Sequence, residues 1–227
     1  MEAVIIIIAI GIIFTIIVRR IPEAKKAMPK ISVKASAEIK DSVKKKIKTD
    51  SDDQKGKKEG SFEKEKDKTK IGFILDEVDD LIDNKEYDEA EKTLIDVIDE
   101  NPQNAKIYNK LGIIYLEKEN FSDAKEAFRT ALKYDKDNDL IYNNLGLSLF
   151  NQGRYVEAAE AYQKSIQLNS LVPHRYINLG LSYSALRKYK EALDAYKRAL
   201  VLDKNNKDYK RLVKEAEEKI IEMKSME

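Results

Sequence analysis

Apolar and small side chains recur with a period of 34 residues through the C-terminal two-thirds of the chain. Four alanines mark the period: Ala90, Ala124, Ala158 and Ala192. Aligned on them, the chain divides into the windows 71–104, 105–138, 139–172 and 173–206. Within each window, positions 4, 7, 8 and 11 form one stripe along a first helix, and positions 17, 20, 24 and 27 form a stripe along a second. Neither helix can bury its stripe alone, so the pattern predicts that neighbouring windows stack.

The sizes of the residues in these stripes predict how the two helices cross. Position 8 is glycine in three windows (Gly112, Gly146 and Gly180) and position 20 is alanine in all four, so the two backbones can approach closely. Large rings at positions 4, 17 and 24 of most windows, and at position 11 of two, would fill the space around each crossing. The motifs Leu-Gly-x-x-Tyr at 111–115 and Ala-x-x-x-Phe at 124–128 complete the pattern, which resembles the tetratricopeptide repeat family.

The resemblance implies an all-α fold, a solenoid of helix-turn-helix units over residues 70–225. The first window is the poorest match, because Glu77 and Val78 stand where Leu-Gly is usual, and this suits a terminal unit. Residues 207–222 are predicted to form the capping helix that such arrays need for solubility. Its inward face is expected to hold Leu212, Val213, Ala216, Ile220 and Ile221.

The first 21 residues follow a different pattern. From Ala3 to Val18 every residue is apolar, Gly or Thr. As a helix this run would span about 24 Å, slightly less than a hydrocarbon core of about 30 Å, and Arg19 and Arg20 can snorkel to the interface. We predict an uncleaved transmembrane anchor that contacts lipid through residues 3–21. Basic residues follow the span, so the positive-inside rule places the rest of the chain in the cytoplasm.

A cleaved signal peptide is the alternative, although only Met1 and Glu2 precede the apolar run and no small-residue cleavage site follows it closely. If the orientation were reversed, the repeats would be exported or periplasmic. Residues 22–69 are rich in Lys, Asp, Glu and Ser and poor in aromatics, which predicts a flexible charged linker. Within it, the spacing of Ala35, Ile39, Val43 and Ile47 leaves open a basic amphipathic helix on anionic lipid.

Composition narrows the possible chemistry. Charged residues make up 37% of the chain, yet the formal net charge is only +1, which argues against a nucleic-acid partner. There is no cysteine and one histidine, and no paired carboxylates or glycine-rich phosphate loop stand out, so we expect neither an enzyme nor a cofactor. The segment Asp135–Asp139 begins like a calcium loop but lacks the glycine and glutamate that complete one. We interpret it as a turn whose Asp and Asn side chains cap the next helix, and we expect no metal.

The candidate site is the groove that the first helices of such repeats line. In the family, positions 2, 5, 6, 9, 12 and 13 point into the groove. Carried over to this chain, the resemblance implies a peptide-binding groove with these principal residues: Asp76, Asp79, Asp83, Lys106, Asn109, Lys110, Asn143, Asn144, Leu147, Phe150, His174, Asn178 and Leu181. The same positions also include Ile113, Leu116, Glu117, Leu140, Asn151 and Ile177.

Asn144 and Asn178 share position 6, where an amide can both donate to and accept from an extended peptide backbone. The pair is similar to a short piece of the asparagine ladder in O-GlcNAc transferase repeats, although Asp76 and Lys110 interrupt it. The carboxylate clamp of chaperone-binding repeats fits less well, because Ile113 and His174 break its pattern. The plain alternative is that these asparagines lie on a solvated helix face.

The acidic side chains of the first window and the Lys, His and amide side chains of the later ones predict a groove with polarised charge. We therefore expect a membrane-anchored adaptor that binds a peptide or protein partner in this groove, with Leu147, Phe150 and Leu181 taking its apolar side chains. The alternative is a structural assembly factor of a secretion or pilus type complex that uses its outer faces. The identity of the partner cannot be predicted from the sequence.

Overall fold

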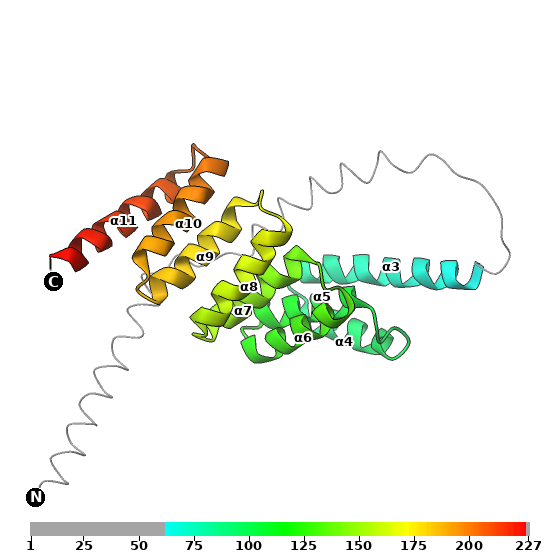
Figure 1. The fold of residues 1–227 in the computed structure, drawn as a ribbon. Coiled ribbons are helices and arrows are strands. Elements are labelled where there is room, and N and C mark those ends of the chain that lie inside the picture. Colours follow the sequence, from blue (N-terminus) through cyan, green and yellow to red (C-terminus); the bar gives the residue numbers. More distant parts are fainter. Residues whose placement is uncertain (1–61, 226–227) are drawn as a thin grey trace, which may run out of the picture. The chain divides into compact units, whose positions relative to one another are not determined.

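The computed structural model describes residues 62–225, with side chains from Lys70 onward. These residues form helices throughout and contain no strand, in agreement with the predicted all-α repeat fold (Figure 1). The elements are α3 (Phe62–Asp83), α4 (Tyr87–Ile98), α5 (Ala105–Glu117), α6 (Phe121–Tyr134), α7 (Asp139–Asn151), α8 (Tyr155–Leu168), α9 (Pro173–Ala185), α10 (Tyr189–Leu202) and α11 (Lys207–Lys224). We call α3, α5, α7 and α9 the A helices, and α4, α6, α8 and α10 the B helices.

The predicted anchor lies outside the described residues, as does the linker up to residue 61. None of the helices within residues 62–225 has an apolar stretch that could reach across a lipid bilayer. The first helix is longer than the repeat pattern indicates: α3 begins at Phe62, inside the predicted linker. Residues 63–68 alternate Glu or Asp with Lys, which are good helix formers apart from Asp67, so a helix nucleated by the apolar stripe can extend through them.

The close crossing predicted at position 8 is present in three repeats. A Cβ atom added at Gly112 would lie 2.4 Å from the Phe128 ring, and one at Gly180 would lie 2.3 Å from the Tyr196 ring. At Gly146 the nearest atom is a ring carbon of Tyr162, at 2.7 Å. Each glycine therefore makes room for the ring at position 24 of its own repeat. In the first repeat, two side chains of intermediate size fill the crossing. Val78 occupies the position of the glycine and Leu94 that of the ring, and both are buried.

A second set of buried positions joins each repeat to the one before it. Position 3 is fully or almost fully buried in the second, third and fourth repeats, as Ile107, Ile141 and Arg175. Position 10 is likewise buried, as Ile114, Ser148 and Ser182. In α3, the first helix of the described residues, the residue at position 3 is Phe73, and its side chain is 70% exposed. Positions 3 and 10 thus form the contact between repeats.

Asparagine caps start three of the helices that follow a B helix. The side chains of Asn104, Asn138 and Asn206 accept hydrogen bonds from backbone N–H groups in the first turns of α5, α7 and α11. Asn138 also donates to the Asp135 carboxylate at 2.7 Å. Segment 135–139 is therefore a capping turn, as its sequence predicts. α9 has no such cap and begins instead with Pro173, whose missing N–H is no loss at a helix start.

The last helix, α11, packs against α10 through an apolar face on which Leu212 and Ala216 are buried. Val213 and Ile220 are partly buried beside them, whereas Ile221 is exposed and was wrongly expected to face inward. Ile221 lies in the last turn of α11, and α10 is four residues shorter than α11, so the end of α11 has less to pack against.

Candidate functional site

Successive A helices meet through residues at the predicted groove positions. On α3 and α5, Asp79 and Lys110 form an ion pair with 2.6 Å between the carboxylate and ammonium atoms. On α7 and α9, the Asn178 amide nitrogen donates to the Asn143 amide oxygen at 3.2 Å. We call the surface that carries these contacts the A-helix face. It contains Asp79 and Lys110 on α3 and α5, and Asn143 and Asn178 on α7 and α9.

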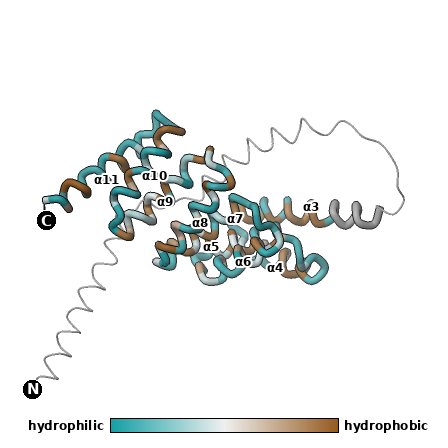
Figure 2. Tube along the Cα trace, viewed as in Figure 1, coloured by the Kyte–Doolittle hydropathy of each residue, from teal (hydrophilic) through white to brown (hydrophobic). Residues whose placement is uncertain are grey.

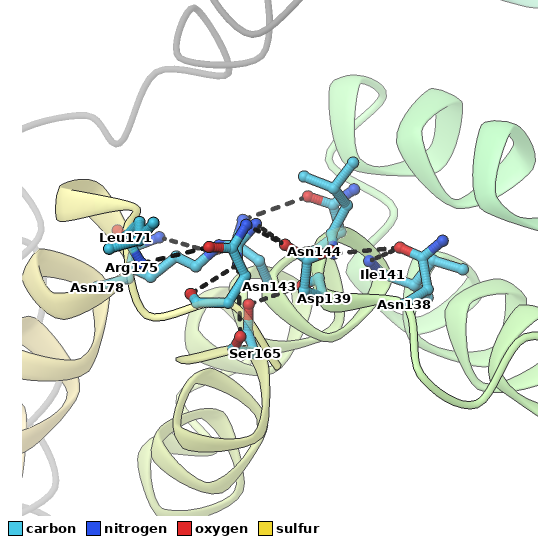
Figure 3. A network of polar contacts seen from close by, with 11 residues as sticks. Asn138, Asp139, Ile141, Asn143, Asn144, Ser165, Leu171, Arg175 and Asn178 are labelled. Carbon is cyan, nitrogen blue, oxygen red and sulfur yellow. Dashed lines mark hydrogen bonds and ion pairs between the residues drawn. The ribbon is translucent and has the colours of Figure 1, made fainter. Parts of the chain in front are cut away.

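Three asparagine side chains on α7 and α9 form a continuous hydrogen-bonded relay (Figure 3). Asn178 donates to Asn143, and Asn143 in turn donates to the Asn144 oxygen through a longer bond of 3.4 Å. The sequence pattern placed Asn144 and Asn178 at the same repeat position, and the structure adds Asn143 as the residue that connects their side chains. The relay has a direction: it ends with the NH2 group of Asn144 and begins with the carbonyl oxygen of Asn178. An amide donor and an amide acceptor at opposite ends match the two hydrogen-bonding groups of a peptide unit.

The charges of the A-helix face are partly compensated within it. Lys110, expected to give the later repeats positive charge, is paired with Asp79, and its side chain is only 13% exposed. His174 does not add charge either, because burial, reinforced by the neighbouring Arg175 guanidinium, lowers its pKa to about 4. Asp76, Asp83 and Lys106 remain exposed. The strong polarisation of charge that the sequence predicted for this face is therefore reduced.

Three apolar residues of the predicted groove were expected to take the apolar side chains of a partner. Leu147, Phe150 and Leu181 are all buried, and the Phe150 ring packs edge-on against Tyr155 with 5.2 Å between ring centroids. Their carbon atoms are in contact with the protein, so they offer little surface to a ligand. Asn109, one repeat before Asn143 at the same position, is half-buried, and its amide oxygen has no hydrogen-bond partner in the structure.

One buried ion pair was not anticipated from the sequence. Arg175, only 1% exposed, lies 2.5 Å from the carboxylate of Asp139 at the start of α7. Its guanidinium also donates to the backbone oxygens of Ser165 and Asn169 (Figure 3). The signal was present in the aligned windows: position 3 holds isoleucine in two repeats and arginine in the fourth. A charge at a position buried elsewhere in the array indicates a buried partner.

Tetratricopeptide repeat models match residues 75–121, 109–173 and 175–206, which together cover every residue from 75 to 206 except His174. The chain therefore belongs to the tetratricopeptide repeat family. No curated protein matches the sequence.

Several solved structures share the fold. MamA is 23% identical, with a TM-score of 0.57 over 66% of this chain and 87% of MamA. PilF of Pseudomonas aeruginosa is also 23% identical, with a TM-score of 0.60 over 66% of this chain and 69% of PilF. The first repeat domain of Spaghetti (RPAP3), solved with an HSP90 peptide, is 21% identical, with a TM-score of 0.51 over 52% of this chain and 94% of that domain. At these identities the likeness shows the fold alone.

Proposed function

We propose that this protein is a membrane-anchored adaptor that binds an extended segment of a partner protein on the A-helix face. The observation that carries the proposal is the Asn178–Asn143–Asn144 relay, which holds an amide acceptor and an amide donor at fixed places on two neighbouring helices. A bound peptide would accept a hydrogen bond from Asn144 and donate one to Asn178. The solved complex of the Spaghetti repeat domain with an HSP90 peptide shows that this fold can hold a peptide.

Exposed charges on α3 and α5 would orient the segment. Lys106 lies towards the start of α5, while Asp76 lies on α3. Charged groups at the rim of a binding surface influence orientation and association rate more than affinity. We therefore expect a partner segment whose basic residues lie near α3 and whose backbone crosses α7 and α9.

Photo-crosslinking in native membranes tests the peptide site. A photoreactive residue at Lys106 or Asn151, both exposed at predicted groove positions, should capture the partner, whereas one at Lys164 on α8 should not. The captured partner is then titrated against Asn144→Ala with Asn178→Ala, for which we expect a loss of affinity of about 5- to 150-fold, because two hydrogen bonds are worth about 1–3 kcal/mol together.

The matched control replaces two exposed amides in the turns between A and B helices, Asn84→Ala with Asn120→Ala. Because Asn178 is itself buried, thermal melting of the relay variant must show that the array remains folded. Wild-type affinity in a folded relay variant would remove the A-helix face from the mechanism and favour assembly through the outer faces.

The anchor is tested separately. Deleting residues 3–18 should move the chain from the membrane to the soluble fraction. The sequence has no native cysteine, so Ser61→Cys reports topology without background. We expect this cysteine to resist a membrane-impermeant maleimide in intact cells and to react after lysis. Labelling of intact cells would reverse the proposed orientation but would leave the peptide site untouched.

A further inference from the structure

Exposed apolar side chains gather along one edge of the repeat array. This edge contains the segments where a B helix ends and the next A-type helix begins: 99–106, 133–140, 167–174 and 201–208. We call these segments junctions 1 to 4. Large exposed apolar residues occur in junctions 2 to 4, as Tyr134, Leu140, Leu171, Val201 and Leu202. At the opposite edge, where A-type helices end and B helices begin, the described chain exposes fewer large apolar residues: Val156 at the start of α8, and Ile221 and Met223 in the last turn of α11. Brown segments mark the loop before α9 and the end of α10 in Figure 2.

Junction 3 differs from the other three in charge. Residues 167–174 contain no Asp, Glu, Lys or Arg, whereas every other junction holds at least three such residues. Leu171 lies in this uncharged segment and is 76% exposed, the largest value among the exposed large apolar residues of the described chain. A leucine displayed in this way has no role in the core of its own repeat.

The loop that displays Leu171 is held in place by the buried polar network. The Asn169 side chain accepts a hydrogen bond from the Leu171 backbone N–H at 3.2 Å and donates to Asp139 at 3.1 Å. Arg175 donates to the Asn169 backbone oxygen at 3.2 Å. Figure 3 shows Leu171 next to this network. Because the loop is already ordered, a partner that covers Leu171 has little backbone entropy to remove.

We propose that junctions 2 to 4 form the interface of a symmetric dimer, with Leu171 next to the two-fold axis. In such an interface a residue near the axis lies next to the same residue of the second chain, so a charged residue there would be placed beside an identical charge. Junction 3 is the only junction without charged residues, and it has an exposed apolar residue on either side, Leu140 and Leu202. Two antiparallel copies would pack Leu171 against Leu171, and Leu140 of each copy against Leu202 of the other.

The flanking charges favour a second copy over a lipid surface. Junction 2 carries Lys133 and Lys136 with three aspartates, and junction 4 carries Lys204 and Lys207 with two. Since acidic residues are at least as numerous as basic ones, an anionic bilayer would not be attracted to this edge. Between antiparallel copies, junction 2 faces junction 4, and residues of both signs on each side allow opposite charges to pair. This interface does not depend on the peptide site proposed above.

Cysteine crosslinking of the full chain in native membranes tests the dimer directly. Leu171→Cys should form a disulfide-linked dimer under mild oxidation, because a disulfide requires Cα atoms within about 7 Å. Leu140→Cys and Leu202→Cys should each remain monomeric alone but crosslink to one another when the two variants are coexpressed. The matched control is Val156→Cys, an exposed apolar residue on α8 away from the edge. Crosslinking at Val156 equal to that at Leu171 would overturn the proposal, as would crosslinking of Leu140→Cys to itself.

A charge at the axis gives a second test. Leu171→Asp, introduced into the coexpressed Leu140→Cys and Leu202→Cys chains, should reduce their crosslinking at least tenfold, whereas Val156→Asp should not. The helical content by circular dichroism should not change, because the replaced side chain is mostly exposed within the single chain. Undiminished crosslinking in the Leu171→Asp background would overturn the proposal. A second result would also overturn the proposal: the chain is monomeric in liposomes, and a fluorescent label on Leu171→Cys reports an apolar environment. That result would mean that this edge contacts the bilayer.

Discussion

Tyr162 and Tyr196 occupy the same position in successive repeats, but only one of their hydroxyl groups has a partner. The Tyr196 hydroxyl lies 3.1 Å from the Ser184 hydroxyl. The Tyr162 hydroxyl is buried with no partner, and burial raises its pKa, so it remains protonated and its hydrogen-bonding capacity is unused. An unsatisfied buried hydroxyl lowers stability, because the group gave up its hydrogen bonds to water on folding.

We therefore expect Tyr162→Phe to stabilise the array by about 1 kcal/mol and Tyr196→Phe to destabilise it by a similar amount. Phe128, which occupies the same position in the second repeat and is fully buried, shows that the site accepts a phenyl ring. Thermal melting of both variants provides the measurement, with an expected shift of about 2–4 °C in each direction. Equal destabilisation by the two substitutions would show that the Tyr162 hydroxyl has a hydrogen-bond partner after all.

At the scale of single helices, the period of the sequence predicted which residues face the partner helix within a repeat. Positions 20 and 24 are buried in all four repeats, because their burial depends only on helix geometry and on one partner helix. The contact surfaces between repeats, at positions 3 and 10, were harder to predict. They depend on the angle between repeats, and polar residues such as Arg175, Ser148 and Ser182 occupy several of them.

For the candidate site, too, the sequence predicted which helices carry the residues but not which side chains contact one another. Position numbers put Asp79, Lys110, Asn143 and Asn178 on the A helices, and the structure shows contacts between them; a binding role for these residues stays a prediction. The particular pairings could not be predicted, because whether Lys110 reaches Asp79, or Asn143 lies between Asn144 and Asn178, depends on side-chain rotamers and on the offset between helices.

The Arg175–Asp139 pair gives a test of the contact between the third and fourth repeats. Asp139→Ala would leave a buried guanidinium with only backbone oxygens as acceptors, and we expect a loss of about 3–5 kcal/mol. Asp139→Ala with Arg175→Ile should recover most of that loss, because isoleucine is buried at the equivalent position of two other repeats.

Urea denaturation of the wild type, both single variants and the double variant measures the coupling between the two residues. Additive losses would mean that the ion pair contributes nothing beyond its separate side chains. The single Arg175→Ile variant, which leaves Asp139 at a partly exposed position, should be less damaging than Asp139→Ala.

At the scale of the whole array, stability should vary along the chain, because each repeat contacts only its neighbours. Within residues 62–225, no repeat packs on the outer side of α3, which exposes Phe73, Glu77 and Asp80 at positions where the inner repeats are buried. The other end is closed by α11, which buries Leu212 and Ala216 against α10. The two ends of the array are therefore unequal, and the inner helices are supported on both sides.

Hydrogen exchange should show this asymmetry. We expect amide protection to be lowest in α3 and α4, highest in α7 to α9, and intermediate in α10 and α11, because opening an end unit breaks one interface while opening an inner unit breaks two. Leu212→Ala removes a buried side chain from the cap at a cost of about 2–5 kcal/mol. Its effect should appear as faster exchange in α10 and α11, with little change in α3 and α4. Uniform protection across the array, or equal acceleration of all helices by Leu212→Ala, would instead mean that the repeats unfold as a single cooperative unit.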